Sequence, residues 1–450
     1  MSLPRRRSTA GDTVFRVCLA LYIALGIARI QDVIPGLAYL RPGKLLVLPM
    51  LVALAVAVPR WQVFAALRTT TAKAVGVVAA LALLSIPLSI WPTNSIRFFL
   101  TALFPGLVLF LAAAVGFADR RTARVCILIL VLSVGADALY MLAGLAPMQK
   151  GRPAIGISLD SNLSAALFVA TLPFAMTLGS GRERRRWLGL AVSLLLVAAV
   201  VKTESRGGAI GLLTVAAILI IRAAPKRRWS YVLAVVACAA AFALTANESS
   251  MERFGTILQP RSDYNFTDRE GRIQVWMRGL SYMLKRPLFG IGVNGFETAE
   301  GVLSGMTNEG FGVSYMAAHN SFIQIGAELG VLGLSAFITA LWSAGRGCQR
   351  IRQRALTSRD RIDRPWLVDG EATLAATTQA ALVGVVVTGF FLSFAYSPIT
   401  LFALAACVGV QAGSPYASHG HGIADLALLN FQPAEARYSH ATSRAATWPT

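Results

Sequence analysis

Apolar runs long enough to cross a lipid bilayer recur along the chain, and short segments containing Arg, Pro and Gly separate them. A transmembrane helix needs about 20 mainly apolar residues. We therefore predict an all-α polytopic membrane protein with about twelve transmembrane helices. The predicted spans are residues 14–30, 44–58, 74–90, 98–117, 123–146, 162–179, 187–201, 208–221, 229–246, 319–342, 376–392 and 398–411.

The composition supports a membrane protein and changes how the charge is interpreted. The chain has 450 residues, of which 55% are hydrophobic and 14% charged, whereas soluble domains carry about 25% charged residues. The formal net charge of +20 raises the question of a nucleic-acid partner. Because the basic residues lie between apolar runs and not on one soluble face, we expect membrane lipids as partners and no nucleic acid.

The distribution of Lys and Arg predicts the orientation. With both termini inside, the cytoplasmic segments hold about 26 of the 42 basic residues, as the positive-inside rule requires. Three arginines at positions 5–7 imitate a signal peptide, but no convincing small-residue cleavage site follows, so we predict a retained helix.

The predicted topology divides the chain into four parts. They are spans one to nine (1–246), an outside loop with an interfacial helix (247–318), spans ten to twelve with an Arg-rich inside loop at 343–375 (319–411), and a cytoplasmic tail that we expect to be disordered (412–450). The outside loop is too long for a plain connector, which indicates a functional element.

Arg206 is the first unusual feature of the predicted outside face. It lies in the run TESRGG at 203–208, at the outside end of a span, and there it opposes the positive-inside trend. Gly207 and Gly208 allow a backbone or a ligand to approach closely. The alternative is an arginine that extends to the lipid headgroups beside flexible glycines.

The second feature is an amphipathic pattern over residues 269–285, which predicts a helix lying on the outer surface. Arg269 and Arg272 share a face of this helix, with Trp276 one turn further on, whereas Arg278 points elsewhere. Pro287 ends the helix, and a glycine-rich turn follows. The alternative is an interfacial helix whose arginines touch lipid phosphates.

The third feature is His319, because the other three histidines lie in the tail. It sits at the outside mouth of span ten, where a histidine can accept or relay a proton near neutral pH. A lone histidine is more often structural than catalytic, and that alternative stays open. Glu328 lies two and a half turns and about 13 Å deeper on the opposite face, so we predict a buried acid that needs a partner and no His–Glu pair.

Arginines and a histidine on one membrane face suit a reaction that expels a phosphate or pyrophosphate. We find no Asp-x-Asp motif, no glycine-rich nucleotide loop, no His/Cys cluster and no G-x-S-x-G in the sequence. We therefore expect no cofactor and no metal ion.

The ordered set of motifs resembles the O-antigen ligase and polysaccharide polymerase family of bacterial inner membranes. The similarity covers about residues 151–407, and the motifs that carry it are Arg152-Pro153, Asp160-Ser161-Asn162, Ser205-Arg206-Gly207-Gly208, Gly271-Arg272, Trp276, Arg286-Pro287, Gly290, Gly292, His319-Asn320-Ser321-Phe322, Glu328, Gly330 and Gly333. Members of this family are multi-span helical proteins with a large periplasmic loop.

The resemblance implies glycosyl transfer at the periplasmic face of the inner membrane. The donor would be a glycan linked to undecaprenyl pyrophosphate, and the acceptor a sugar hydroxyl on lipid A-core or on another lipid-linked glycan. It implies that Arg206 and Arg272 hold the pyrophosphate and that His319 activates or positions the acceptor hydroxyl. Arg152 and Arg269 are further candidates for the same anionic pocket.

Other functions remain open on the sequence alone. The shared motifs do not separate an O-antigen ligase from a polysaccharide polymerase. A lipid or glycan transporter or flippase would use the arginines as an anion site and His319 for proton coupling. The absence of visible repeats and the crowding of candidates at one face disfavour the transporter. A structural scaffold for an envelope machine would leave these residues unexplained.

Overall fold

A computed structural model of the chain describes residues 10–34, 36–40, 42–149, 151–155, 160–178, 183–222, 228–229, 271–302, 307–308, 312–313, 316–358 and 365–416. Several predictions lie outside these residues. They are Arg269, nearly all of the ninth span, residues 247–270 of the outside loop, and the tail beyond residue 416.

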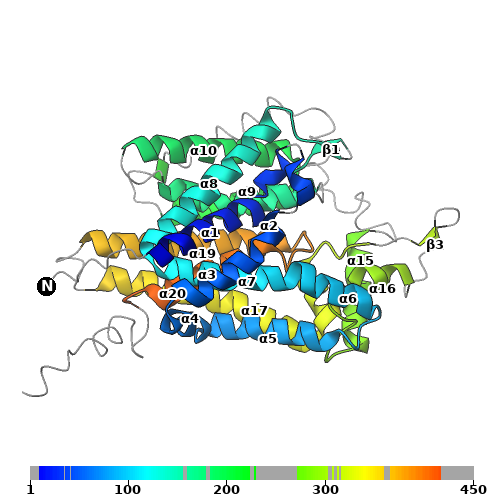
Figure 1. The fold of residues 1–450 in the computed structure, drawn as a ribbon. Coiled ribbons are helices and arrows are strands. Elements are labelled where there is room, and N and C mark those ends of the chain that lie inside the picture. Colours follow the sequence, from blue (N-terminus) through cyan, green and yellow to red (C-terminus); the bar gives the residue numbers. More distant parts are fainter. Residues whose placement is uncertain are drawn as a thin grey trace, which may run out of the picture.

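The described part of the chain is a helical bundle in which the long helices run side by side (Figure 1). Its helices are α1 (Ala10–Gly26), η1 (Ile30–Asp32), η2 (Leu37–Leu40), α2 (Pro42–Leu45), α3 (Val47–Ala57), α4 (Arg60–Leu67), α5 (Thr70–Ser85), α6 (Pro92–Phe98), the π-helical η3 (Phe99–Leu103), α7 (Phe104–Ala118), α8 (Arg120–Leu142), α9 (Ser161–Leu178), α10 (Glu183–Lys202), α11 (Arg206–Arg222), α15 (Arg272–Lys285), α16 (Phe296–Val302), α17 (Ser321–Thr357), α19 (Pro365–Gly389) and α20 (Pro398–Gly413).

Two short antiparallel hairpins complete the structure. They pair β1 (Met148–Gln149) with β2 (Arg152–Pro153), and β3 (Thr307–Asn308) with β4 (Gly312–Val313). The labels β1, α6, α15, α16 and β3 all lie toward one end of the bundle in Figure 1. We call this end the α15 end.

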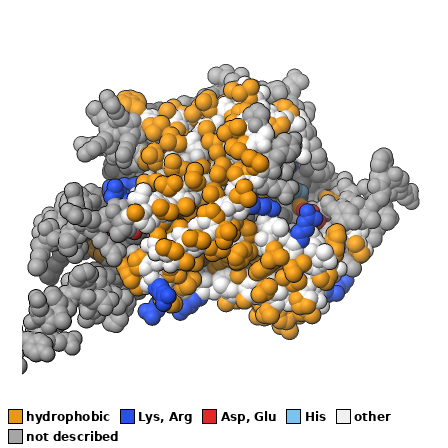
Figure 2. All heavy atoms as spheres, in the orientation of Figure 1, with side chains coloured by type: hydrophobic (Ala, Val, Ile, Leu, Met, Phe, Trp, Pro, Cys, Tyr) orange, Lys and Arg blue, Asp and Glu red, His pale blue; other side chains and the backbone are white. Residues whose placement is uncertain are grey.

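The helices are those expected of a polytopic all-α membrane protein. Within the described residues, five helices are long and apolar enough to cross a membrane, and a sixth crossing results if the pair Pro42–Ala57 and Arg60–Leu67, bent by 111°, is one span. Hydrophobic side chains cover much of the visible face between the two ends (Figure 2). Such an apolar surface suits lipid. Each predicted span within the described residues coincides with a helix, and the count of twelve crossings stays a prediction.

The interior of the bundle is filled by small and aromatic side chains. Phe117 on α7, Phe174 on α9 and Phe402 on α20 meet edge to face, with ring centroids 5.5–6.4 Å apart. All three rings are almost completely buried. Edge-to-face pairs add to the free energy gained by burial alone. This cluster therefore joins three helices that are far apart in the sequence.

The helix α17 extends further than the sequence pattern predicted. Span ten was predicted to end at residue 342, with a loop over 343–375, but α17 continues to Thr357 and α19 begins at Pro365. The side chains in this extension are mainly Arg, Gln, Leu and Ala, which favour helix once a helix has started. Trp342 is exposed, and the Arg346 guanidinium lies 5.4 Å from the centre of its ring.

A glycine-rich loop of residues 287–295 is buried at the α15 end. Ile291 and Val293 are almost fully enclosed between α17 and the segment that joins α5 to α6. On the α5–α6 side, the Val293 N–H donates to Ser85 Oγ at 3.1 Å, and Ser95 Oγ donates to the Val293 carbonyl at 2.7 Å. The predicted glycine turn is therefore a docked structural element.

The other side of the glycine loop bonds to a break in α17. At the break, Gly330 has φ 68° and ψ −168°, a conformation that only glycine adopts without strain. In an unbroken helix the Val331 N–H would donate to the Ala327 carbonyl. Here Val331 donates to the Pro287 carbonyl at 2.8 Å, while the Ala327 carbonyl accepts from Ile291 at 2.9 Å. The break thus exchanges helical hydrogen bonds for bonds to the loop.

We expect Gly330→Ala to destabilise the protein by about 2 kcal/mol or more, because φ is positive and the new methyl group would stand 2.2 Å from the Pro287 carbonyl oxygen. The matched control is Gly76→Ala in α5, where a Cβ meets nothing within 4 Å. Thermal unfolding of both variants in detergent tests this expectation. Equal midpoints for the two variants would contradict the role of the break.

Candidate functional site

Arg206 is the first residue of α11, half-buried at the end of that helix. Ser205 caps the helix by accepting the Gly208 N–H at 3.1 Å. The two glycines after Arg206 are used for close packing. A Cβ at Gly207 would lie 2.7 Å from Phe391, and one at Gly208 would lie 2.6 Å from Ala165. The motif therefore fixes α11 against α9 and against the turn that leads into α20.

Arg272 is the first residue of α15, after Gly271 in extended conformation. The structure confirms an amphipathic helix here and ends it at Lys285, as predicted. One turn beyond Arg272, the indole Nε1 of Trp276 donates to the Ala318 carbonyl at 2.9 Å. Since Ala318 immediately precedes His319, this bond links the first turn of α15 to the histidine segment.

Arg278, on the same helix, has a different role, which the sequence did not reveal. Its guanidinium binds Glu300 of α16 with Nε–Oε2 2.9 Å and Nη2–Oε2 2.6 Å, and Glu300 is fully buried. Tyr282 donates to the same carboxylate at 2.9 Å. Burial and the neighbouring Glu300 raise the pKa of the Tyr282 hydroxyl, which keeps it a donor. This group holds α15 against α16.

His319 lies in a tight turn at the start of α17, with φ 46°. Asn320 caps the helix, its Oδ1 accepting the N–H groups of Phe322 at 2.9 Å and Ile323 at 3.1 Å. Left-handed backbone at a residue other than glycine is strained and frequent at functional sites. It persists here because the cap on one side and the Trp276 bond on the other hold the segment. His319 is the only histidine in the described part of the chain.

The turn at residues 390–397, between α19 and α20, contacts both the start of α11, where Arg206 lies, and the start of α17, which follows His319. Phe391 of this turn packs against Gly207. The next residues of the turn bond to the start of α17, where Ser321 Oγ donates to the Leu392 carbonyl at 2.7 Å and accepts the Phe394 N–H at 3.2 Å. The turn therefore links the first turn of α11 to the start of α17, and the Trp276 bond links α15 to the residue before His319.

Arg152 lies one helix away from this group. It is on β2, in the hairpin that docks on α9 through the bond from the Ile155 N–H to Ser164 Oγ at 3.0 Å. The adjacent residue Ala165 packs against Gly208 of α11. The structure thus places the hairpin that carries Arg152 and the start of α11 against neighbouring faces of α9.

The buried carboxylate of Glu328 is hydrogen-bonded to backbone N–H groups. Its carboxylate accepts the backbone N–H groups of Asn294 at 3.0 Å and Phe296 at 3.3 Å. Both donors belong to the glycine loop and to the start of α16. Glu328 is therefore bound by backbone groups, which agrees with the rejection of a His–Glu pair.

The described residues contain no group of three or more His, Cys, Asp or Glu side chains arranged to hold a metal ion.

Comparison with known proteins gives a family assignment. Residues 191–338 match the family model described as O-antigen ligase. Over this segment the chain is similar to the O-antigen ligase family. The matched segment runs from within α10 into α17, so it contains Arg206, Arg272, Trp276 and His319 but not Arg152. No curated protein matches the sequence significantly.

The Trp276 bond gives a test of how His319 is positioned in the segment that is similar to O-antigen ligases. We expect Trp276→Phe to lower glycan transfer about tenfold, the loss expected for one hydrogen bond of about 1.4 kcal/mol. The thermal unfolding midpoint should move little, because the aromatic packing is kept. A change in the rate at which diethyl pyrocarbonate modifies His319 should accompany the loss. Trp187→Phe, at an exposed position on α10, is the control.

Proposed function

We propose that the protein is a lipid-linked-glycan glycosyltransferase of the O-antigen ligase type. It transfers a glycan from undecaprenyl pyrophosphate to a sugar hydroxyl of lipid A-core at the periplasmic face of the bacterial inner membrane. The observation that carries this proposal is the hydrogen bond from Trp276, one turn after Arg272, to Ala318, which precedes His319, inside the segment that matches the O-antigen ligase model.

In the proposed reaction the acceptor hydroxyl attacks the anomeric carbon of the donor. The bond from that carbon to the pyrophosphate oxygen breaks, and its electron pair leaves with undecaprenyl pyrophosphate. His319 takes the proton of the hydroxyl as the new bond forms. Arg206 and Arg272 stabilise the charge that grows on the leaving group, with Arg152 and Arg269 as further contributors. Neither a nucleotide nor a metal ion is needed, because the donor is already activated.

The surface of α15 supports an interfacial position for this site. Met277, Leu280 and Leu284 recur at helical spacing and are 60%, 37% and 67% exposed, while Val275, Gly279 and Tyr282 face the protein. A helix with an apolar face left exposed beside a transmembrane bundle fits the boundary between headgroups and acyl chains. At this depth the arginines meet a pyrophosphate whose lipid tail remains in the bilayer.

The basic extension of α17 supports the proposed orientation. Arg346, Arg350, Arg352 and Arg354 lie at the end of α17 opposite to His319. Placing them in the cytoplasm satisfies the positive-inside rule and puts the α15 end in the periplasm. Both termini are then cytoplasmic, with residues 247–318 outside.

His319→Ala should abolish glycan transfer without reducing expression or membrane insertion, since the side chain accepts the proton in the reaction. The assay is transfer from lipid-linked glycan to lipid A-core by purified protein. His419→Ala, which removes a histidine of the tail, is the matched control. Wild-type turnover in the His319 variant would remove its catalytic role.

Arg206→Ala and Arg272→Ala should each lower turnover about 100-fold, the effect typical of losing one group that stabilises a developing anion. Lysine at either position should restore only part of the rate, because the bidentate fork is lost. Lys285→Ala, an exposed basic residue in the last turn of α15, is the control. Full rescue by lysine would contradict a bidentate pyrophosphate contact.

The alternative within the same family is a polysaccharide polymerase, which joins lipid-linked repeat units by the same chemistry. Purified protein with lipid-linked glycan, with and without lipid A-core, separates the two. Product on lipid A-core identifies the ligase, and a lengthened lipid-linked glycan identifies the polymerase. If neither product forms, the transporter or flippase becomes the better hypothesis.

A further inference from the structure

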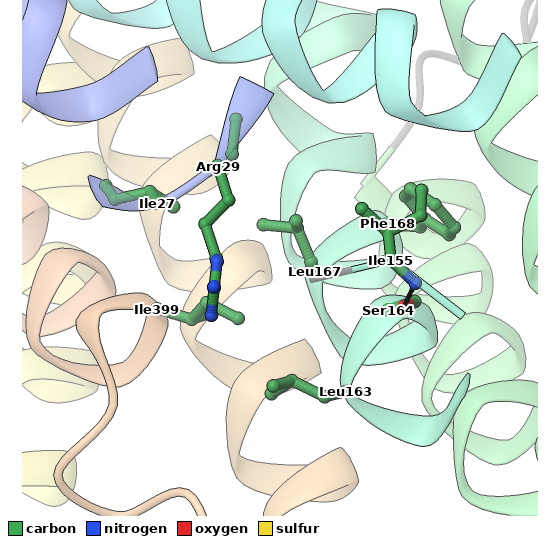
Figure 3. A pocket seen from close by; sticks show the side chains of 9 residues that line it. Ile27, Arg29, Ile155, Leu163, Ser164, Leu167, Phe168 and Ile399 are labelled. Carbon is green, nitrogen blue, oxygen red and sulfur yellow. Dashed lines mark hydrogen bonds between the residues drawn. The ribbon is translucent and has the colours of Figure 1, made fainter. Parts of the chain in front are cut away.

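A small pocket lies beside the end of α1, where the chain enters η1. Its wall is formed by Ile27, Leu163, Leu167, Phe168 and Ile399, which come from α1, α9 and α20 or their ends. Ile155, next to the β1–β2 hairpin, closes one side, and Arg29 extends its guanidinium into the space between Ile399 and Leu163 (Figure 3). The pocket therefore combines one cationic side chain with apolar walls.

The backbone and Asp32 hold Arg29 in this position. Arg29 has φ 57°, a left-handed conformation that is strained for a residue with a side chain. Its Nε lies 2.8 Å from Asp32 Oδ2, and the Asp32 side chain is 7% exposed. Asp137 on α8, fully buried, also interacts electrostatically with Arg29 and Asp32. Asp32 thus engages the Nε edge of the guanidinium.

The two terminal nitrogens of Arg29 are left for a ligand. Among the described residues, no hydrogen bond to Arg29 Nη1 or Nη2 is formed, and the side chain is 31% exposed. No acidic residue is among those that line the pocket. Two parallel N–H groups of a guanidinium match two oxygens of a phosphate. The apolar walls beside them match a hydrocarbon chain.

We propose that this pocket binds a phosphate group carried on an apolar chain. The space is ≈ 40 Å³, so it holds the first part of the chain beside the phosphate, and the rest lies along the lipid-facing surface. Two sources share this chemistry, a polyprenyl phosphate and a membrane phospholipid. An inorganic phosphate would lose the apolar contacts, and a neutral polyprenol would leave the guanidinium without its partner.

The pocket is separate from the proposed transfer site. Leu163 and Ser164 line it, whereas the next residue, Ala165, packs against Gly208 two residues after Arg206. The pocket and the start of α11 thus contact neighbouring faces of α9, and neither Arg206 nor Arg272 lines the pocket. Binding of a lipid phosphate to the pocket does not depend on glycan transfer, so it can be measured without an acceptor.

Binding of radiolabelled undecaprenyl phosphate to the full chain in maltoside micelles tests the proposal. The protein carries Arg206→Ala and Arg272→Ala, so that the proposed transfer site does not contribute. In this background Arg29→Ala and Leu163→Trp should each weaken binding at least tenfold. The first removes the guanidinium and the second fills the pocket. Arg97→Ala, an exposed arginine on α6, should leave binding unchanged.

Competition identifies the source of the phosphate. Undecaprenol and inorganic phosphate should not displace the label. Equal displacement by phosphatidylglycerol assigns the pocket to membrane phospholipid, and displacement at least tenfold weaker assigns it to the polyprenyl carrier.

Three results would overturn the proposal. The first is an unchanged affinity for the labelled lipid in a folded Arg29→Ala variant. The second is displacement of the label by undecaprenol or by inorganic phosphate alone. The third is tighter cation binding after removal of Arg29, which would indicate a cation site at Asp32 and Asp137. Thermal unfolding checks that each variant is folded. If Arg29→Ala does not fold, Arg29→Lys and Leu163→Trp decide the question.

Discussion

The exchange of hydrogen bonds between the glycine loop and the break in α17 is the constraint on which the α15 end depends. Ile291 and Val331 together replace one helical bond by two bonds between segments. Backbone groups buried in an apolar bundle must be paired, so neither segment can keep this conformation alone. Gly330 makes the exchange possible, and Glu328 strengthens it by accepting two N–H groups of the loop and of α16.

This constraint also explains the position of the functional candidates. The glycine loop ends at α16, and α16 is bound to α15 by the Arg278–Glu300 ion pair. The helix α15 in turn bonds to Ala318, which precedes His319. The route from the loop through both helices ends at Ala318, just before α17 and twelve residues before the break at Gly330. The histidine segment is therefore held at both ends, although it has no regular secondary structure of its own.

The sequence predicted the helices well because each depends on a local property, the length of an apolar run. It also predicted the amphipathic helix now seen at Arg272–Lys285. The sequence did not predict side-chain contacts whose partner lies in a distant segment. The partners of Arg278 and Glu328 are Glu300 and the N–H groups of Asn294 and Phe296, and no periodicity reveals such pairs.

The sequence named the candidate residues of the site, but it predicted their packing only in part. Gly207 and Gly208 suggested close approach by a backbone or ligand, and the structure shows packing against Phe391 and Ala165. The sequence gives no sign of the pocket around Arg29, because most of its wall comes from helices more than 130 residues away. The end of α17 was assigned to a loop because a charged composition does not distinguish a loop from an exposed helix.

The long helix α17 has a consequence for the membrane itself. One end is fixed at Asn320 by its cap and the neighbouring turn, and Trp342 with Arg346 forms an aromatic and cationic anchor near the other. These positions are about 33 Å apart at 1.5 Å per residue, close to the thickness of a hydrocarbon core of about 30 Å. In a bilayer with a thinner or thicker hydrocarbon core, the core thickness would not match the distance between these two positions on α17. The helical hydrogen bonds of α17 are interrupted between them, at Gly330. The distance between the two anchors of α17 is thus a constraint that the bilayer and the α15 end share.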